Sequence, residues 1–372
     1  MKLTIERAAL MKALAHVQSV VERRNTIPIL ANVLMEAEGS HLRLTATDMD
    51  LAIVEAVEAK IAKSGTTTAP AHTLYDIVRK LPEGSEIEID SADGGAQITI
   101  RTGRAKFSLA TLPKDEFPLT SDGDMPVTFE LPAPELRTIV DRTKFAISTE
   151  ETRYYLNGIY LHAAETDGVK VLRAVATDGH RLARFEMALP EGAAAMPGVI
   201  VPRKMVNELR KLADDTSGVV TLSLSPTRIR LAFDNLVLSS KLIDGTFPDY
   251  ERVIPSGNDK IMEVACRDFA QAVDRVATIA TEKSRAVKLS LTPRTLTLSA
   301  SSAENGMATE ELEALYDKDP IEIGFNARYL LDIAQQIEGD RAQFAMADAA
   351  SPTIVRDAAD ASALYVLMPM RV

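Results

Sequence analysis

The sequence contains very little cysteine and no tryptophan. Cys266 is the one cysteine in 372 residues, which excludes a disulfide within one chain, and we expect it to be a small buried side chain in a strand. The five histidines are scattered without metal-ligand spacing, so we predict neither a metal site nor a cofactor. No run reaches the roughly 18 apolar residues that a membrane span needs, and the first residues lack the apolar core of a signal peptide. We therefore expect a cytoplasmic protein.

Basic residues are also outnumbered by acidic ones. The formal net charge is −11, from 42 basic and 53 acidic residues, which argues against a generic basic nucleic-acid-binding protein but not against a local basic surface. The length allows two or three domains of roughly 100–200 residues each. A hydrophobic fraction of 46% is that of an ordinary globular chain.

What the chain does contain is a repeated corner. The run Ala176-Thr177-Asp178-Gly179-His180-Arg181-Leu182 follows a strand-like apolar stretch, as does Ala46-Thr47-Asp48-Met49-Asp50-Leu51-Ala52, which lies 130 residues earlier. A weaker copy, Ala300-Ser301-Ser302-Ala303-Glu304, lies 124 residues later, and Phe117-Pro118 recurs as Phe247-Pro248. These repeats indicate three modules. The repeat is too long for a solenoid, whose units are roughly 20–50 residues.

Around each corner the periodicity predicts one long and one short amphipathic helix among alternating strands. The predicted helices cover 6–24, 72–81, 134–148, 202–213, 267–285 and 326–338. Polar stretches at 119–126 and 254–260 are candidate boundaries. We therefore predict an α+β protein of three tandem modules, 1–122, 127–253 and 260–372, each with two helices packed on antiparallel sheets.

The predicted helices differ in charge from the rest of the chain. They carry a net +7, which leaves −18 for the remainder. Exposed helix faces that carry positive charge suit a partner with a diffuse negative surface, and contacts to phosphates carry no sequence information. Since no aromatic platform for single strands accompanies them, duplex DNA held by its backbone is the favoured partner.

Two other functions are compatible with the residues. Asp178 and His180 could form an acid/base pair of a hydrolase, although Asp48 and Asp50 occupy that corner in the first module without a histidine. A β-rich scaffold that binds no nucleic acid would fit the negative net charge.

Several runs carry a resemblance to a known family. They are Arg153-Tyr154-Tyr155-Leu156-Asn157-Gly158, the corner at Ala176 to Leu182, Val201-Pro202-Arg203-Lys204, Ser240-Lys241-Leu242 with Phe247-Pro248-Asp249-Tyr250, and Tyr365-Val366-Leu367-Met368-Pro369-Met370-Arg371. In this order, over essentially the whole length, the chain resembles the bacterial sliding clamps, the beta subunits of DNA polymerase III.

The resemblance implies a head-to-tail homodimer that closes into a ring, with the helices facing duplex DNA. It implies a non-catalytic subunit of the DNA polymerase holoenzyme. Its partners would be the replicative polymerase alpha subunit, the clamp loader, and other polymerases and repair proteins that bind through short linear motifs.

The resemblance also implies three sets of residues. DNA-facing residues would be Lys12, Arg24, Arg79, Tyr155, Arg203 and Lys204. A partner-peptide pocket would be lined by Leu156, Thr177, Gly179, His180, Arg181, Leu182, Pro248, Arg252, Val253, Val366, Met368, Pro369 and Met370. The dimer interface would include Arg104, Lys106, Phe107, Leu109, Ile279 and Glu304.

The sequence departs from the family pattern near the pocket. Glu251 stands where a basic residue is common, Pro352 where a polar residue is common, and residues 163–174 make a longer connection than expected. These departures bear on peptide preference rather than on the fold.

Overall fold

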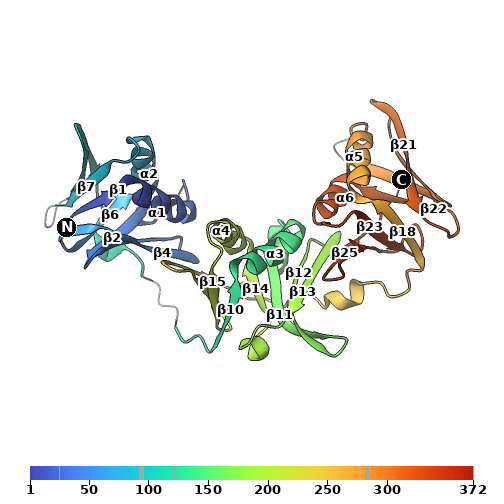
Figure 1. Cartoon of the computed structure of the whole chain (residues 1–372), viewed down its shortest axis with the longest axis horizontal. Helices are drawn as coiled ribbons and strands as arrows, with labels where there is room; N and C mark the ends of the chain where they lie inside the picture. The colour runs from blue at the N-terminus through green and yellow to red at the C-terminus, as the bar shows by residue number, and fades with distance from the viewer. Residues whose placement is uncertain (25, 92–95, 120–122, 281–284, 372) are drawn as a thin grey trace. The chain divides into compact units, whose positions relative to one another are not determined.

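The computed structural model describes residues 1–24, 26–91, 96–119, 123–280 and 285–371 (Figure 1). They form two compact units. The first contains Met1–Arg137, Pro190–Pro197 and Lys204–Leu242, and the second contains Thr138–Leu189, Gly198–Arg203 and Ile243–Val372. Part of the predicted boundary at 119–126, including the end of the first module at 120–122, lies outside the described residues.

The described residues form six α-helices, each at a predicted place. They are α1 (Arg7–Val20), α2 (Ala71–Lys80), α3 (Ala133–Thr143), α4 (Arg203–Asp214), α5 (Cys266–Ala277) and α6 (Ala327–Ala334). Their buried faces follow the apolar stripes of the sequence, as with Leu10, Leu14 and Val17 on α1.

Most of the helices end earlier than their periodicity predicts. The prediction for α1 extended to Arg24, but the helix stops at Val20 because Val21 is extended, with φ −75° and ψ 119°. The prediction for α3 extended to Ser148, but a separate 3-10 turn, Lys144–Ala146, follows the helix. The predicted part of α5 at 281–284 lies outside the described residues. Arg23, Arg24 and Lys144 therefore lie beyond the helices that were expected to carry them.

Cys266 was expected in a strand, and this was wrong: it is the first residue of α5. Its burial was correctly predicted, with 6% of the residue exposed. Its thiol donates a 3.5 Å hydrogen bond to the carbonyl of Ala334 at the end of α6. The apolar run that suggests a strand is β18, which stops one residue earlier, at Ala265.

The first unit contains two antiparallel sheets. The five-stranded sheet has the order β5 (Lys60–Lys63), β1 (Lys2–Glu6), β7 (Glu86–Ser91), β8 (Gln97–Thr102), β9 (Ala105–Ala110). The eight-stranded sheet has the order β10 (Val127–Pro132), β15 (Val219–Leu224), β16 (Arg228–Ala232), β17 (Leu236–Lys241), β4 (Leu51–Glu58), β3 (His41–Thr47), β2 (Asn32–Glu38), β6 (Gly65–Pro70).

The second unit is built on one twelve-stranded sheet. Its order is β14 (Val199–Pro202), β11 (Gly158–Thr166), β12 (Val169–Thr177), β13 (Arg181–Ala188), β25 (Ala363–Leu367), β24 (Thr353–Asp357), β23 (Arg341–Met346), β18 (Lys260–Ala265), β21 (Gly306–Leu315), β20 (Thr295–Ser302), β19 (Ala286–Thr292), β22 (Ile321–Asn326).

Two strand pairs join predicted modules through the same elements. We call the β4–β17 pair junction one and the β13–β25 pair junction two. In each, the strand that follows a repeated corner pairs with the last strand of the next module: Leu51 lies opposite Ser240, and Arg181 lies opposite Leu367. The repeat seen in the sequence is therefore also a repeat of strand pairing.

The connection at 163–174, which is longer than the family pattern leads us to expect, is part of a hairpin. Strands β11 and β12 pair from Tyr160 opposite Val175 to Thr166 opposite Val169. The turn consists of Asp167 and Gly168, both with positive φ, of 51° and 79°. Residues 163–174 therefore belong to the two strands and their turn rather than to a loop.

Candidate functional site

The corner between β12 and β13, which we call corner two, is held by its own polar side chains. The hydroxyl of Thr177 donates to the carbonyl of Arg181 at 2.7 Å and accepts from the amide of Gly179 at 3.1 Å. The carboxylate of Asp178 accepts from the amides of His180 and Arg181 at 2.9 and 3.0 Å. Such Asx turns fix backbone direction.

The corner between β3 and β4, corner one, repeats these bonds. The hydroxyl of Thr47 donates to the carbonyl of Leu51 at 2.9 Å and accepts from the amide of Met49 at 3.0 Å. Asp48 accepts from the amides of Asp50 and Leu51 at 3.0 and 2.7 Å. The aspartates are therefore structural in both corners, which removes the acid/base role considered for Asp178. Among the described residues, no cluster of His, Cys, Asp or Glu side chains could hold a metal.

Corner two also positions the C-terminal strand. Leu182 lies opposite Val366 in the β13–β25 register, and the amide of Met368 donates to the carbonyl of His180 at 2.9 Å. The amide of Met370 donates to the carbonyl of Gly324 at 2.7 Å. The tail is thus held against the corner and against the end strand β22.

The residues of the predicted pocket separate into an apolar floor and an exposed rim, all within the second unit. Leu156, Leu182 and Val366 are buried and belong to one cluster with Val175, Ile200, Phe247 and Tyr250. The exposed residues are Gly179, His180, Pro248, Arg252, Val253 and Met368, and Thr177, Pro369 and Met370 are half-buried. Val253 and Met368 are 51% and 42% exposed, which is high for apolar side chains beside a core cluster. An apolar floor with apolar rim residues suits an apolar peptide anchor.

Arg181 has a different position from the other predicted pocket residues. Its side chain is 7% exposed, and its guanidinium donates to Asp332 at 2.5 Å, to the carbonyl of Phe145 at 2.6 Å and to Asp178 at 3.2 Å. It also lies 4.3 Å from the centre of the Tyr329 ring. Its charge is therefore used within the fold.

A buried network that the sequence did not reveal lies behind the rim. Arg173 donates to Glu186 at 2.6 Å, to Glu251 at 2.5 Å and to the hydroxyl of Tyr250 at 2.7 Å. The same hydroxyl lies 2.9 Å from Nε2 of His162. Since Tyr250 begins the 3-10 turn Tyr250–Val253, the network fixes one side of the rim. The unusual Glu251 is explained here, as a partner of Arg173.

The pKa values of two residues in this network, Tyr250 and His162, are shifted. Burial raises the pKa of Tyr250, and the neighbouring Arg173 charge opposes that rise. Burial lowers the pKa of His162. Arg173 lies within a run of buried residues in β12, and its partners Glu186, Tyr250 and Glu251 are 13 to 78 positions away, so the sequence contained no local signal for the network.

In corner two, the guanidinium of Arg153 lies close to the Cα of Gly179, where a larger residue would place its Cβ. Gly179 has φ +88°, and a Cβ there would lie 2.5 Å from Nη1 of Arg153. Arg153 is itself held by Glu150 at 2.6 and 2.8 Å. In corner one the equivalent residue is Met49, with φ 80° and 48% exposure.

The predicted DNA-facing residues are divided between the units: Lys12, Arg24, Arg79 and Lys204 lie in the first, and Tyr155 and Arg203 in the second. Lys12, Arg24, Arg79 and Arg203 are exposed. Arg79 pairs with Asp76 at 3.2 Å. Lys204 pairs with Asp48 and, at 3.1 Å, with Glu22. The observed helices contain thirteen basic and eight acidic residues, a net +5, so the positive excess is present but smaller than the +7 predicted.

Three of the predicted interface residues, Lys106, Phe107 and Leu109, lie on strand β9, and Arg104, Ile279 and Glu304 lie in turns. In the described part of the chain β9, which carries Lys106, Phe107 and Leu109, pairs only with β8. Strand β21 pairs with β20 along its length and with β18 only through Ala314 and Leu315. Ile279 accepts a 3.5 Å hydrogen bond from Asn305, in the loop that also carries Glu304.

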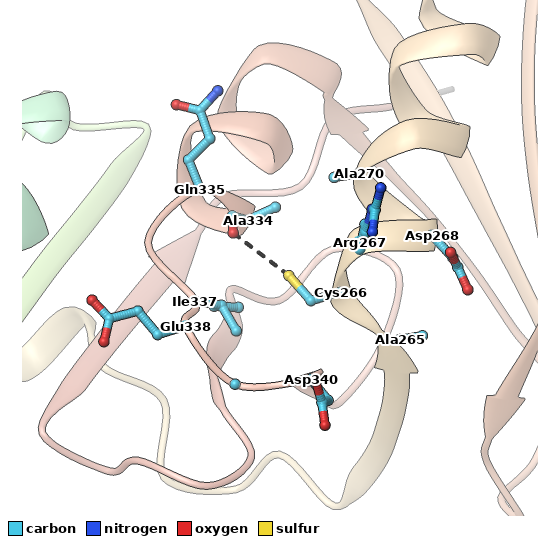
Figure 2. Close-up of a pocket in the computed structure, with 11 residues that line it drawn as sticks. Ala265, Cys266, Arg267, Asp268, Ala270, Ala334, Gln335, Ile337, Glu338 and Asp340 are labelled. Carbon is cyan, nitrogen blue, oxygen red and sulfur yellow. Dashed lines mark hydrogen bonds between the residues drawn. The ribbon is translucent and has the colours of Figure 1, made fainter.

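A cavity of about 540 Å³ lies between the start of α5 and the end of α6 (Figure 2). Its lining includes Cys266 and Ala334, which are joined by the thiol hydrogen bond, and also Gly339 and Asp340. Burial raises the pKa of the Cys266 thiol, so the reactive thiolate form is disfavoured. None of the predicted site residues lines this cavity.

The chain matches family models over nearly its full length. Residues 1–121 match the N-terminal domain of the DNA polymerase III beta subunit, residues 130–249 its central domain, and residues 251–371 its C-terminal domain. None of the helices in the described ranges is long and apolar enough to cross a membrane.

Relatives and solved structures point to the same family as these models. A beta sliding clamp of Caulobacter vibrioides is 54% identical and one of Escherichia coli 38%, each with complete coverage of both chains. A sliding clamp from Bartonella birtlesii, solved with griselimycin bound, is 50% identical with a TM-score of 0.97, and a Caulobacter crescentus clamp is 54% identical with a TM-score of 0.96, again with complete coverage. With three clamp modules, paired corners and whole-length similarity, the chain belongs to the DNA polymerase III beta subunit family, the non-catalytic beta sliding clamps of bacteria.

Proposed function

We propose that this chain acts as a sliding clamp and processivity factor, in which two copies join head to tail as a closed ring around duplex DNA. The observation that carries this proposal is the repeated junction. Junctions one and two join consecutive modules, and β9 and β21 retain open edges in the first and last modules. Two further junctions, one at each contact between the two copies, would use both edges and close the ring, because heterologous contacts that close give rings.

We propose that the module boundaries are those predicted, 1–122, 127–253 and 260–372. At the ring interface, β9 of one copy would meet β21 of the other. Phe107, Leu109 and Ile279 would supply apolar contact, and Arg104 and Lys106 would face Glu304. Charge complementarity of this kind selects the head-to-tail pairing over other pairings.

For DNA, we propose contact with phosphates through Lys12, Arg24, Arg79, Tyr155, Arg203 and Lys204. Few contacts suit a ring that must slide, because topology rather than affinity retains it on the DNA. Lys204 is already paired with Asp48 and Glu22, so Lys12 and Arg24 are the stronger candidates for phosphate contact.

For partners, we propose that the floor formed by Leu156, Leu182 and Val366, with its rim, binds short linear motifs of the polymerase alpha subunit, the clamp loader and other polymerases and repair proteins. The flexible Met368 and Met370 on the rim suit a surface that accepts several peptides. A protein with these partners would work in the cytoplasm.

Retention on DNA tests the ring. Clamp loaded onto nicked circular DNA should stay bound through gel filtration at high salt and should be lost once the circle is linearised. Equal retention on linear DNA with free ends would contradict the proposal. Neutralising Lys12 and Arg24 together should reduce loading or retention, and neutralising two acidic residues of β7, Glu86 and Glu88, provides a control that should not.

Griselimycin tests the pocket. We expect the chain to bind it, and Val366→Arg to abolish binding because a charge would enter the apolar floor. Val219→Arg, at an exposed apolar residue of the first unit, is the matched control. Unchanged binding by Val366→Arg in a folded protein would show that the pocket lies elsewhere.

A further inference from the structure

The first helix of each module carries a basic or titratable side chain at the same position. Helix α1 begins at Arg7 and α3 at Ala133, and α5 begins at Cys266. Nine positions after these starts stand His16, Arg142 and Arg275.

Two of these residues reach an acid just beyond the short helix of the following module. Nε2 of His16 lies 2.8 Å from Oδ2 of Asp215, which follows α4. Nη2 of Arg142 lies 2.9 Å from Oε1 of Glu338, which follows α6. We call this contact the helix-end latch. It connects adjacent modules within one unit in each case.

His16 also bonds to an acid of its own module, and Arg275 has the same bond. Nδ1 of His16 lies 2.8 Å from Glu55, and Nε and Nη2 of Arg275 donate to Glu310 at 3.0 and 2.5 Å. Glu55 and Glu310 each stand four positions after the first residue of their strands, β4 and β21. Arg275 therefore makes the bond to an acid of its own module, as His16 does with Glu55.

Among the described residues, no acid of a following module lies beside Arg275 as Asp215 does beside His16 and Glu338 beside Arg142. The Arg275 side chain is 57% exposed, and its Nη1 donates no hydrogen bond within the described part of the chain. In a head-to-tail ring the following module is the first module of the other copy.

We propose that Arg275 forms the helix-end latch of the ring interface with Glu83 of the partner subunit, while it keeps its bond to Glu310. Asp215 stands twelve positions after the start of α4 at Arg203, and Glu83 stands twelve positions after the start of α2 at Ala71. Glu83 is exposed, just beyond α2. This inference rests on the proposed ring and names an ion pair that helps to close it.

A double-mutant cycle on the dimer tests the latch. The dimer dissociation constant of the full chain is measured by sedimentation for wild type, Glu83→Gln, Arg275→Gln and the double variant. We expect each single change to weaken the dimer about tenfold, since two latches close one ring, and the double variant to be no weaker than Arg275→Gln alone. The coupling should shrink at high salt. Additive effects, or no effect of Glu83→Gln, would overturn the proposal.

Charge reversal adds a second cycle that does not depend on small effects. Arg275→Glu and Glu83→Arg should each weaken the dimer more than the neutral changes do, and the combination should recover most of the loss. Arg267→Glu, on the same helix, is the matched control and should not be rescued by Glu83→Arg. Thermal unfolding of each variant identifies any that fails to fold, and the neutral cycle then decides.

The experiments distinguish a failure of the latch proposal from a failure of the proposed clamp function. If the cycle shows no coupling while wild type still dimerises and stays on circular DNA, the latch is wrong and the clamp proposal stands. If wild type does not dimerise, or is retained equally on linear DNA, the clamp proposal itself fails.

Discussion

Arg181 and Asp332 form a 2.5 Å ion pair that ties corner two to helix α6. Arg181 is 7% and Asp332 25% exposed at the side chain. Breaking a buried pair costs about 3–5 kcal/mol, because the remaining charge loses its partner. Partial exposure of Asp332 moves the expected cost to the lower end of this range.

We expect Arg181→Ala to lower the free energy of unfolding of the second unit by about 3 kcal/mol, measured by urea titration. Arg328→Ala is the control, because Arg328 is 66% exposed and 3.9 Å from the same carboxylate, so its pair is worth under about 1 kcal/mol. Equal effects of the two variants would show that Arg181 does not support the junction.

His16 should make the first unit sensitive to pH. Burial lowers the pKa of His16, but its hydrogen bonds and charge interactions with Glu55 and Asp215 outweigh burial and raise it. A pKa raised on folding contributes stability that is full below the unfolded value of about 6.5 and is lost as pH rises through the folded value. We expect the thermal midpoint of the first unit to fall over that window.

His16→Arg provides the matched variant, since Arg142 occupies the equivalent position in the next module and stays charged. In this variant the decline as the pH rises above about 6.5 should disappear, because arginine does not titrate near neutral pH. A decline that persists unchanged in His16→Arg would assign the pH dependence to other groups.

Substitutions at the residue with positive φ should change stability in opposite directions in the two corners: Met49→Gly in corner one should stabilise, and Gly179→Ala in corner two should destabilise. Met49 has φ 80°, which costs a residue with a Cβ about 1–2 kcal/mol. Met49→Gly should remove that strain, and after the entropic cost of glycine of roughly 0.5–1 kcal/mol a small net gain in unfolding free energy should remain. Met49→Ala keeps the Cβ and should show no gain.

Gly179→Ala should destabilise corner two. The new Cβ would meet Nη1 of Arg153 at 2.5 Å in addition to the left-handed strain of about 1–2 kcal/mol. Denaturant unfolding measures the loss, and Gly257→Ala, where a Cβ meets nothing within 4 Å, is the control. A Gly179→Ala protein as stable as the control would contradict the tight approach of Arg153.

The network behind the rim should affect peptide binding at a distance. Tyr250→Phe removes the hydroxyl that accepts from Arg173 and contacts His162. Leaving buried polar groups unpaired costs about 1–3 kcal/mol, and the loss should loosen the turn that carries Arg252 and Val253. We expect weaker griselimycin binding by calorimetry, without loss of the dimer.

Tyr75→Phe is the control, because the Tyr75 ring lies beside Arg79 in the first unit. Its binding should equal that of wild type. Unchanged binding by Tyr250→Phe, with the expected loss of stability, would mean that the network supports the core and not the rim.

Much of the fold could be predicted from local pattern. The six helices follow apolar spacing such as that of Leu10, Leu14 and Val17, and the corners follow Thr-Asp pairs whose side chains bond to backbone within four residues. Both depend on neighbours in the chain, so the sequence by itself determined them. Helix ends were less predictable, because the backbone at Val21 turns away although the spacing continues.

Only the tertiary structure decided how individual charges are used. Arg173, Arg181 and Lys204 are ordinary strand or helix cations in the sequence, yet the first two are buried in ion-pair networks and the third is held by Asp48 and Glu22. Their partners Glu186, Asp332, Asp48 and Glu22 lie 13 to 182 positions away, so no local pattern signals these pairs. The contact of Arg275 with Glu310 also depends on tertiary structure, because it requires helix α5 to pack against strand β21.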